Sequence, residues 1–420
     1  MKQLLPQYKM KKRNFKSTKH ACYTGYIVQA VINNIAPLLF VIFSTQFNIS
    51  FERLSILITV NFVTQMIIDI SSVKFIDKIG YRILSVSSQF ITFLGLALMA
   101  ILPNIMKNSF VGIVISIMFC AIGSGLTEVI ISPIVESIPG DKKTSEMSLL
   151  HSFYCWGQVF VVIVTTLLIK AFGEQYWYIV PAIWSIIPFA NSLNFTTVPL
   201  AKTLTKEEKT PLKKMLFSYE FIFAMIIMIC AGASEIAMSQ WSSYFAETGL
   251  KISKVTGDLL GPCLFAIFMG IGRTFFGFYG EKIKIKTALT ICSSICIACY
   301  IGASLSKLPL LSLLYCALTG LGVSIMWPAT FSLSARMFPK GGGSMFGVMA
   351  LAGDLGCTLG PWLVSYISVL YSNSLSEGDA LKKGLGYGAI FPIIMVISVI
   401  MLGIKEKFVD KKSNNDIINT

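Results

Sequence analysis

Charged residues are scarce in this sequence. They make up 13% of its 420 residues, whereas a typical soluble domain has about 25%. Hydrophobic residues make up 54%, and the mean hydropathy is +0.71. Such a composition excludes a set of soluble domains, although the length alone would allow several of them. Twelve spans of ~20 residues would occupy roughly 240 residues and leave short loops. We therefore predict a polytopic membrane protein.

Histidine is scarce as well, and nucleotide-binding motifs and long loops are lacking. His20 and His151 are the two histidines of the chain, and no metal-ligand spacing stands out. The pattern GxxxxGK[ST] does not occur, and no loop is long enough for a nucleotide-binding domain. These absences argue against ATP-driven transport and covalent enzymatic chemistry. We expect no cofactor, no bound metal and no enzyme activity.

The ten cysteines do not form an extracellular cluster. All of them lie within or at the ends of apolar segments, so a disulfide framework is not expected. Cys292, Cys296 and Cys299 have a spacing that resembles an iron–sulfur motif, but they lie in an apolar helical stretch. We interpret them as small packing residues. The basic start of the chain lacks a cleavage site, so we expect the first span to be retained.

Twelve apolar segments are long enough to cross a bilayer. Several exceed 20 residues, which indicates tilt rather than further spans. Prolines interrupt some of them, and such breaks are tolerated where neighbouring groups bind the freed carbonyls. The segments lie at 21–44, 54–76, 83–106, 109–136, 146–171, 177–198, 219–245, 258–280, 285–306, 308–335, 343–371 and 384–404.

The distribution of Lys and Arg predicts the topology. With the N-terminus inside, 27 of the 35 basic residues fall in cytoplasmic segments and 8 outside. The positive-inside rule then places both termini in the cytoplasm of a cell-membrane protein. This asymmetry also explains the net charge of +14 by topology and lipid contact, so no nucleic-acid partner is expected.

The longest predicted loop divides the chain into two groups of six spans. We expect the following divisions: a cytoplasmic tail at 1–20, a bundle at 21–198, a linker at 199–217, a second bundle at 218–404 and a tail at 405–420.

Two short internal repeats support a duplication. Residues 69–84 align with 273–288 at an offset of 204, which matches Asp77 with Glu281. Residues 125–133, "GLTEVIISP", align with 320–328, "GLGVSIMWP". The paired segments occupy equivalent places in the two groups of spans. We therefore predict two pseudo-symmetric six-helix bundles in an all-α membrane protein.

The loop "FIDKIGYR" at 75–82 resembles the signature Gly-x-Leu-x-Asp-Arg-x-Gly-Arg-Arg of the major facilitator superfamily. The second copy restores the leading glycine as Gly277. The resemblance implies alternating access of two bundles and a cytoplasmic gate, whereas the residues alone also allow an ordinary charged loop. The gate residues that we expect are Asp69, Asp77, Gly80, Arg82, Arg273, Gly277 and Glu281.

Spans 1, 4, 5 and 7 resemble the fucose-permease-like sugar:proton symporters. The segments that carry this similarity are "NNIAPLLF", "GLTEVIISPIVE", "MSLLHSFYCWGQ" and "GASEIAMSQW". The resemblance places the essential acid of span 4 on Glu128. It places the acid of span 1 on Asn34, which is an amide. This departure puts in question whether the two-carboxylate proton scheme of that branch applies to this chain.

Six ionisable residues fall inside the predicted spans, where such groups are rare and usually face a bundle interior. They are Asp69, Glu128, His151, Glu235, Arg273 and Asp354. We assign proton coupling to Glu128 and Glu235, although either could be structural. Asp69 and Arg273 are expected to pair across the halves. Asp354 and His151 are open between substrate binding and a structural or solvated role.

Polar residues form stripes on spans 1, 5 and 7, which indicates an internal aqueous path. Ser239 and Ser242 extend the stripe of Glu235. Tryptophans near these stripes either stack on a sugar ring or serve as packing residues and interface anchors. The expected substrate-binding residues are Gln29, Asn33, Asn34, His151, Tyr154, Gln158, Trp241, Trp327 and Asp354.

We therefore predict a secondary active transporter that moves a small polar solute, a sugar by resemblance, with protons as the coupling ion. We expect a monomer in the lipid bilayer. Two alternatives stay open: an exporter of amphipathic compounds, and a non-transporting sensor or scaffold on a transporter fold.

Overall fold

The computed structural model describes residues 15–49, 51–200, 210–246, 250–252, 256–257 and 259–418, and these residues contain helices and no strands. The first half holds α1 (Phe15–Phe47), α2 (Phe51–Ile79), α3 (Tyr81–Ile105), α4 (Ser109–Ser137), α5 (Lys143–Phe172), η1 (Glu174–Tyr176) and α6 (Ile179–Thr197). The short α7 (Leu212–Leu216) precedes the second half. That half holds α8 (Tyr219–Tyr244), η3 (Leu259–Cys263), α10 (Leu264–Tyr279), η4 (Gly280–Lys282), α11 (Ile285–Leu305), α12 (Pro309–Val323), α13 (Met326–Met337), α14 (Gly342–Tyr371), α15 (Glu377–Gly388) and α16 (Ile390–Ile418).

The predicted spans are present in the described part of the chain. Ten helical segments there are long and apolar enough to cross a membrane, and α1 and α2 add helices of 33 and 29 residues. Three spans are less regular than predicted. The span at 308–335 is broken into α12 and α13, the last span into α15 and α16, and the span at 258–280 begins with a π-turn.

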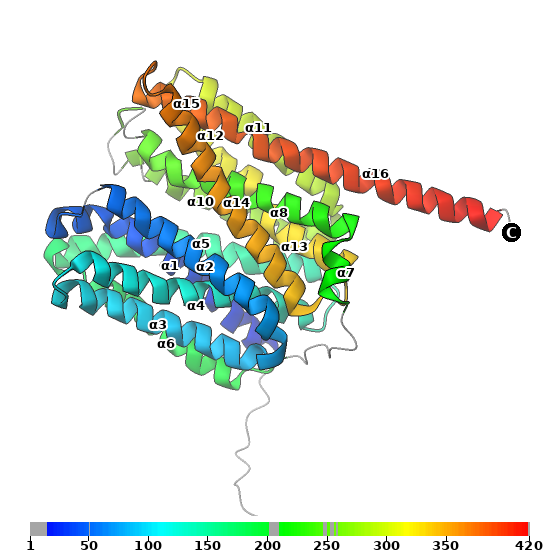
Figure 1. The fold of residues 1–420 in the computed structure, drawn as a ribbon, viewed down its shortest axis with the longest axis horizontal. Coiled ribbons are helices and arrows are strands. Elements are labelled where there is room, and N and C mark those ends of the chain that lie inside the picture. The colour runs from blue at the N-terminus through cyan, green and yellow to red at the C-terminus, as the bar shows by residue number, and fades with distance from the viewer. Residues whose placement is uncertain are drawn as a thin grey trace, which may run out of the picture.

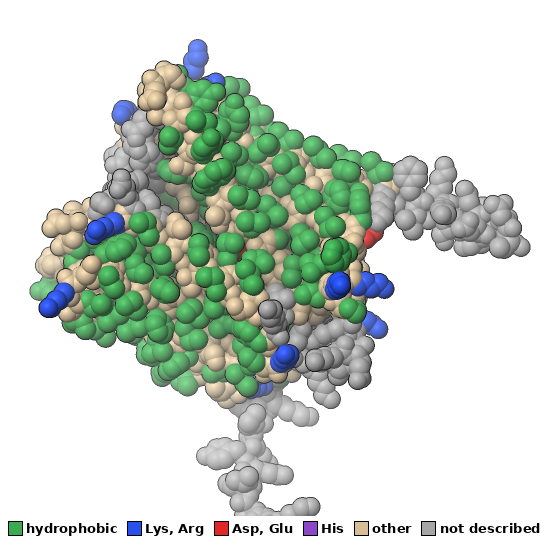
Figure 2. All heavy atoms as spheres, in the orientation of Figure 1, with side chains coloured by type: hydrophobic (Ala, Val, Ile, Leu, Met, Phe, Trp, Pro, Cys, Tyr) green, Lys and Arg blue, Asp and Glu red, His purple; other side chains and the backbone are tan. Residues whose placement is uncertain are grey.

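The helices form two bundles that lie side by side. In Figure 1, α1 to α6 lie below and α8 to α16 lie above. The bundles meet where α2 packs on α14 and where α5 packs on α10. We call the end that carries α7 the linker side and the opposite end the far side. Figure 2 shows hydrophobic side chains over the flank and Lys and Arg near the ends, as a lipid-facing surface requires.

Contacts at the linker side reproduce the predicted repeat. Arg82 Nη2 donates to the carbonyl of Val198 at 2.9 Å, and Lys286 Nζ donates to the carbonyl of Leu402 at 3.5 Å. Both pairs are separated by the same offset of 204 that relates the two sequence repeats. In each half, therefore, a basic residue at the start of the third span contacts a backbone carbonyl near the predicted end of the sixth span.

The loop between α2 and α3 is a tight turn, as predicted. Gly80 has φ of +88°, a conformation that side chains other than glycine disfavour. Arg82, however, binds the last carbonyls of α6 in its own half, with distances of 2.7 to 2.9 Å. Arg82, which we expected in the cytoplasmic gate, therefore makes these contacts within the first half. The side chain of Asp77 lies outside the described residues.

All ten cysteines are free, and nine of them are buried. The packing role predicted for them agrees with this, because a buried thiol behaves as a small hydrophobic group.

Candidate functional site

The buried ionisable residues are the six that the sequence singled out. Among the described residues, the buried side chains of Asp, Glu, His, Lys or Arg are Asp69, Glu128, His151, Glu235, Arg273 and Asp354. Four of them are acids and one is a permanent cation. A buried charge is costly without a partner. One cation can neutralise one of the four acids, so the other three carboxyl groups have no cation to neutralise them unless they bind protons.

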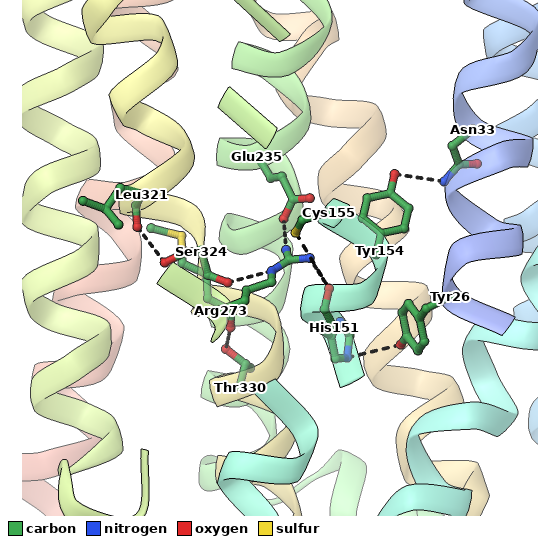
Figure 3. Close-up of polar contacts among 11 residues, drawn as sticks. Tyr26, Asn33, His151, Tyr154, Cys155, Glu235, Arg273, Leu321, Ser324 and Thr330 are labelled. Atoms are coloured by element: carbon green, nitrogen blue, oxygen red, sulfur yellow. Dashed lines mark hydrogen bonds and ion pairs between the residues drawn. The ribbon is translucent and has the colours of Figure 1, made fainter. Parts of the chain in front are cut away.

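Arg273 of α10 makes the central ion pair. Its Nη2 donates to Glu235 Oε2 of α8 at 2.8 Å, and both side chains are buried. Nε donates at 2.8 Å to the carbonyl of Ser324, which lies where α12 breaks before α13. Nη1 donates at 3.2 Å to the carbonyl of His151 on α5, so the guanidinium bridges the two halves (Figure 3). Five donors in a fixed plane suit arginine to such multiple contacts.

The predicted pair of Asp69 and Arg273 does not form. Arg273 binds Glu235 instead, because both residues face the interior of the second half. The carboxyl group of Asp69 on α2 lies in hydrogen-bonding contact with that of Asp354 on α14. Asp69 does bridge the halves, then, but with an acid and not with a base. Asp354, expected in the substrate site, belongs to this interface.

Glu128 lies in the same interior, on α4. Its Oε2 accepts from Gln29 Nε2 of α1 at 2.9 Å, and it lies within electrostatic range of Asp354 and Glu235. No ion pair of Glu128 occurs within the described ranges, so its charge is opposed by an amide dipole only.

Two residues of the polar stripe on α5, His151 and Tyr154, contact α1. His151 Nε2 and Tyr26 Oη share a hydrogen bond of 3.2 Å, and Tyr26 Oη also lies 3.2 Å from Ser132 Oγ. One turn further, Asn33 Nδ2 donates to Tyr154 Oη at 3.3 Å (Figure 3). His151 is buried, so the wet position considered from the sequence is wrong.

The other predicted polar residues have more local surroundings. Asn34, where the symporter resemblance expects an acid, donates to the carbonyl of Ala30 on its own helix at 2.8 Å. Gln158 is half-buried on α5. Ser239 and Ser242 donate to carbonyls of α8 itself.

A cavity opens toward the far side, next to the buried polar groups. It is small and partly open, with a volume of about 40 Å³. The helices α1 to α4 supply most of its wall, and α8 adds one residue. The lining residues are Ile32, Asn33, Ala36, Pro37, Phe40, Leu57, Asn61, Phe62, Met99, Ile117, Cys120 and Gln240.

Of the predicted substrate-binding residues, Asn33 lines this cavity. Sequence reasoning missed Asn61 and Gln240, whose carboxamides also face it. Their signal was available: Asn61 is a polar residue in an apolar span, and Gln240 is adjacent to Trp241 in the stripe of α8.

The tryptophans proposed for sugar stacking lie outside the cavity wall. Trp241 Nε1 donates to the carbonyl of Pro361 on α14 at 3.2 Å. Trp327 is buried, and its ring packs so closely on Gly353 that a Cβ there would lie 2.2 Å from Cη2 of the indole. In this conformation, both rings pack between helices of the second half, which agrees with the alternative weighed from the sequence.

The two halves are closed against each other at the linker side. Glu281 Oε1 of η4 accepts from the backbone N–H groups of Thr144 and Ser145 at 2.7 and 3.2 Å, at the start of α5. Arg336 Nη2 joins this contact, with bonds to Thr144 Oγ1 and Glu281 Oε2. A Cβ on Gly277 would lie 3.2 Å from Leu149 of α5, so glycine permits the close approach.

Glu281 supplies the cap that α5 lacks. Lys142 at the N-cap position makes no side-chain hydrogen bond to the helix, and a carboxylate at a helix N-terminus is favourable by about 0.3 to 2 kcal/mol. Glu281→Gln is expected to weaken this closure by about 1 kcal/mol, which corresponds to ~5-fold more frequent opening. Hydrogen–deuterium exchange of residues 143–149 measures the change.

Asp379→Asn is the matched control, because Asp379 is an exposed acid whose ion pair at 3.9 Å stays within α15. Equal exchange of residues 143–149 in both variants and the parent would show that Glu281 does not hold the linker side closed.

Comparison with known proteins agrees with this architecture. The model of the Major Facilitator Superfamily matches residues 22–361. The crystal structure of FucP, a fucose:proton symporter of E. coli, is similar with a TM-score of 0.75 at 14% identity, and the match covers 92% of this chain and 98% of that one. The proton:xylose symporter XylE has a TM-score of 0.75 at 13% identity, with 92% and 95% covered.

A bacterial homologue of the iron transporter ferroportin is similar as well, with a TM-score of 0.72 at 11% identity and 92% and 99% covered. A sequence search of curated proteins gave no match. Identities this low support the shared fold and leave the substrate open. The family model, by contrast, covers most of the chain, and the twelve spans in two pseudo-symmetric bundles agree with it. This chain therefore belongs to the major facilitator superfamily of membrane transporters.

Proposed function

We propose that this protein is a proton-coupled secondary transporter of a small uncharged polar solute, a sugar or a polyol. The observation that carries the proposal is the neighbourhood of two features: a far-side cavity with three carboxamides, and an interior with more buried acids than buried cations. The first can bind a solute, and the second can bind protons.

The cavity wall is suited to hydroxyl groups. Asn33, Asn61 and Gln240 each offer both a donor and an acceptor, which a hydroxyl needs. Phe40 and Phe62 add apolar faces to the same wall. Sites for small ligands combine an apolar lining with a few polar groups in the same way. The fold shared with fucose:proton and proton:xylose symporters supports a sugar as the solute.

The closure at the linker side supports alternating access. With the linker side cytoplasmic, as the distribution of Lys and Arg predicts, the present conformation would face outward. Proton coupling is then assigned to Glu128 and Glu235, the acids nearest the polar contacts of α1 and α5. Protonation changes the cost of burying a carboxyl group and so biases one facing state.

Reconstituted protein tests the proposal. Proteoliposomes with an acidic outside and a neutral inside are expected to accumulate a labelled sugar or polyol from a panel, and a protonophore should stop the accumulation. Uptake that ignores the protonophore would overturn proton coupling. Absence of uptake and of counterflow for every sugar and polyol in the panel would overturn the solute class.

An exporter of amphipathic compounds is a second candidate, because nine of the twelve cavity residues are apolar or Cys. One substitution separates the two. Asn61→Leu removes a carboxamide and extends the apolar wall, so it should weaken sugar binding about tenfold, the effect of ~1.4 kcal/mol. The same change should leave or improve binding of a lipophilic cation. Isothermal titration calorimetry measures both.

Asn104→Leu serves as the control, because Asn104 is an exposed amide at the end of α3, away from the cavity. If Asn61→Leu and Asn104→Leu bind sugar alike, the cavity described above is not the sugar site.

A further inference from the structure

Two buried aspartates join the halves where α2 packs on α14. Asp69 is fully buried and Asp354 is 3% exposed, and their carboxyl groups are in hydrogen-bonding contact. One turn beyond Asp354, Thr358 Oγ1 lies 3.8 Å from Met66 Sδ of α2. The acids are therefore part of a packed contact between two helices from different halves.

Among the described residues, no side chain donates a hydrogen bond to offset the burial of these two carboxyl groups. Both side-chain oxygens of Asp69, and Oδ2 of Asp354, have no hydrogen-bond donor among the described residues. Gln65 lies one turn from Asp69 on the same helix, yet its Nε2 also has no partner. No group of acids, histidines or cysteines in the described ranges has the geometry of a metal site. A proton is the remaining species that fits between two carboxyl oxygens in contact.

The surrounding charges favour that proton. Glu128 of α4 acts on Asp69, and Glu235 of α8 in turn acts on Glu128, so both further acids add negative potential. Cys357, next to the pair on α14, is a buried thiol that contributes no cation. The guanidinium of Arg273 pairs with Glu235 and not with the two aspartates. Two ionised carboxylates in contact would repel strongly in this low-dielectric interior, and such dyads hold one proton between them.

We propose that Asp69 and Asp354 share one proton, and that this proton fastens the α2–α14 contact in the conformation closed at the linker side. When the shared O–H bond breaks, the proton passes to water and leaves two carboxylates that push the halves apart. The pair is thus a proton site separate from Glu235 and Arg273. The assignment rests on the function proposed above only for what the proton does in transport.

The opposite contact between the halves serves as an internal reference. Where α5 packs on α10, Ser148 Oγ donates to the carbonyl of Arg273 at 2.7 Å, and Arg273 donates to the carbonyl of His151. Neither bond requires a shared proton, because arginine stays charged at every accessible pH. Deprotonation should therefore loosen the α2–α14 contact and spare the α5–α10 contact.

Hydrogen–deuterium exchange on the full-length protein in detergent tests this asymmetry, after correction for the intrinsic pH dependence of exchange. From about pH 6 to about pH 9, we expect exchange of residues 62–72 and 350–358 to rise about tenfold relative to residues 148–155 and 270–277. A parallel response of both contacts would overturn the proposal. This measurement needs no variant, no substrate and no transport.

Infrared difference spectroscopy then locates the proton. The C=O stretch of a protonated carboxylic acid should disappear in Asp69→Asn and in Asp354→Asn, because an amide donates to the remaining carboxylate without a proton. Asp379→Asn, an exposed acid in α15, should keep the band. Both Asn variants should also lose the pH response of exchange. A band that persists in both would place the proton on another acid and overturn the assignment.

The same measurements separate this site from the proposed function. A protein that transports no sugar but shows the band and the asymmetric exchange would support the shared proton and contradict the proposed solute. Proton-driven uptake by a protein without the band would support the proposed transport function and contradict the shared proton.

Discussion

Arg273→Gln is expected to abolish transport and to destabilise the protein by about 3 to 5 kcal/mol, because it leaves the buried carboxylate of Glu235 without its cation. The substitution also removes donors from the carbonyls of Ser324 and His151, at 2.8 and 3.2 Å. The first of these carbonyls has been freed by a helix break, and the second belongs to the other half. Thermal unfolding in detergent and uptake by proteoliposomes measure the two effects.

A second substitution tests the cause. In Glu235→Gln/Arg273→Gln, no buried charge is left alone, so most of the lost stability should return while transport stays absent. Arg273→Lys keeps the charge but not the planar fork of donors, and it should recover stability only in part. Arg336→Gln is the matched control, since its side chain is 53% exposed and surface pairs contribute about 0 to 1 kcal/mol. Equal losses in Arg273→Gln and Arg336→Gln would contradict the central role of the ion pair.

The sequence was sufficient to identify which charges are buried. The apolar context of each span and the rise of 1.5 Å per residue indicate how deep a side chain lies. That information selected Asp69, Glu128, His151, Glu235, Arg273 and Asp354, and all six are buried. Local patterns also predicted the turn at Gly80 and the face shared by His151 and Tyr154, since both depend on short spacings.

The partners of those residues could not be predicted, because depth does not specify how a helix is rotated against its neighbours. Asp69 and Arg273 lie at aligned positions of the repeat, yet each binds a residue of a different helix. The carbonyl of Ser324 became an acceptor only because "GLGVSIMWP" breaks, whereas the aligned "GLTEVIISP" stays helical in α4. Packing of the whole second half decides that difference.

The wall of the cavity could be predicted only in part, because residues of different helices form it. Asn33 was predicted from the stripe on span 1, but Asn61 and Gln240 meet it only after α2 and α8 are placed in three dimensions. Trp241 shows the converse, because its neighbour Gln240 faces the cavity while its own indole N–H binds Pro361 of α14. Adjacent helical residues point about 100° apart, so a polar or aromatic cluster in the sequence does not share one environment.

Glu128→Gln is expected to abolish accumulation of the solute against its gradient and to leave counterflow of the solute intact. Each unit of pH gradient is worth about 1.4 kcal/mol per proton, so a one-proton symporter should accumulate solute about tenfold per unit. A glutamine keeps the shape and a hydrogen bond with Gln29, which lies 2.9 Å from Glu128, but it cannot bind the coupling proton. The variant should therefore equilibrate solute without concentrating it, while counterflow stays close to that of the parent.

Glu174→Gln provides the control, because Glu174 is an exposed acid at the far end of α5. Accumulation by Glu128→Gln at the level of Glu174→Gln would remove Glu128 from the coupling mechanism and leave Glu235 and the Asp69–Asp354 pair as the remaining acids. If the Glu128→Gln variant loses both counterflow and accumulation, Glu128 would instead be assigned to solute binding. The distinction matters because Asn34 stands where related symporters are expected to carry a second acid, and its amide bonds to its own helix. With an amide at that position, the acids left to hold the proposed coupling proton are Glu128, Glu235 and the Asp69–Asp354 pair, and the comparison of Glu128→Gln with Glu174→Gln separates the first of these from the others.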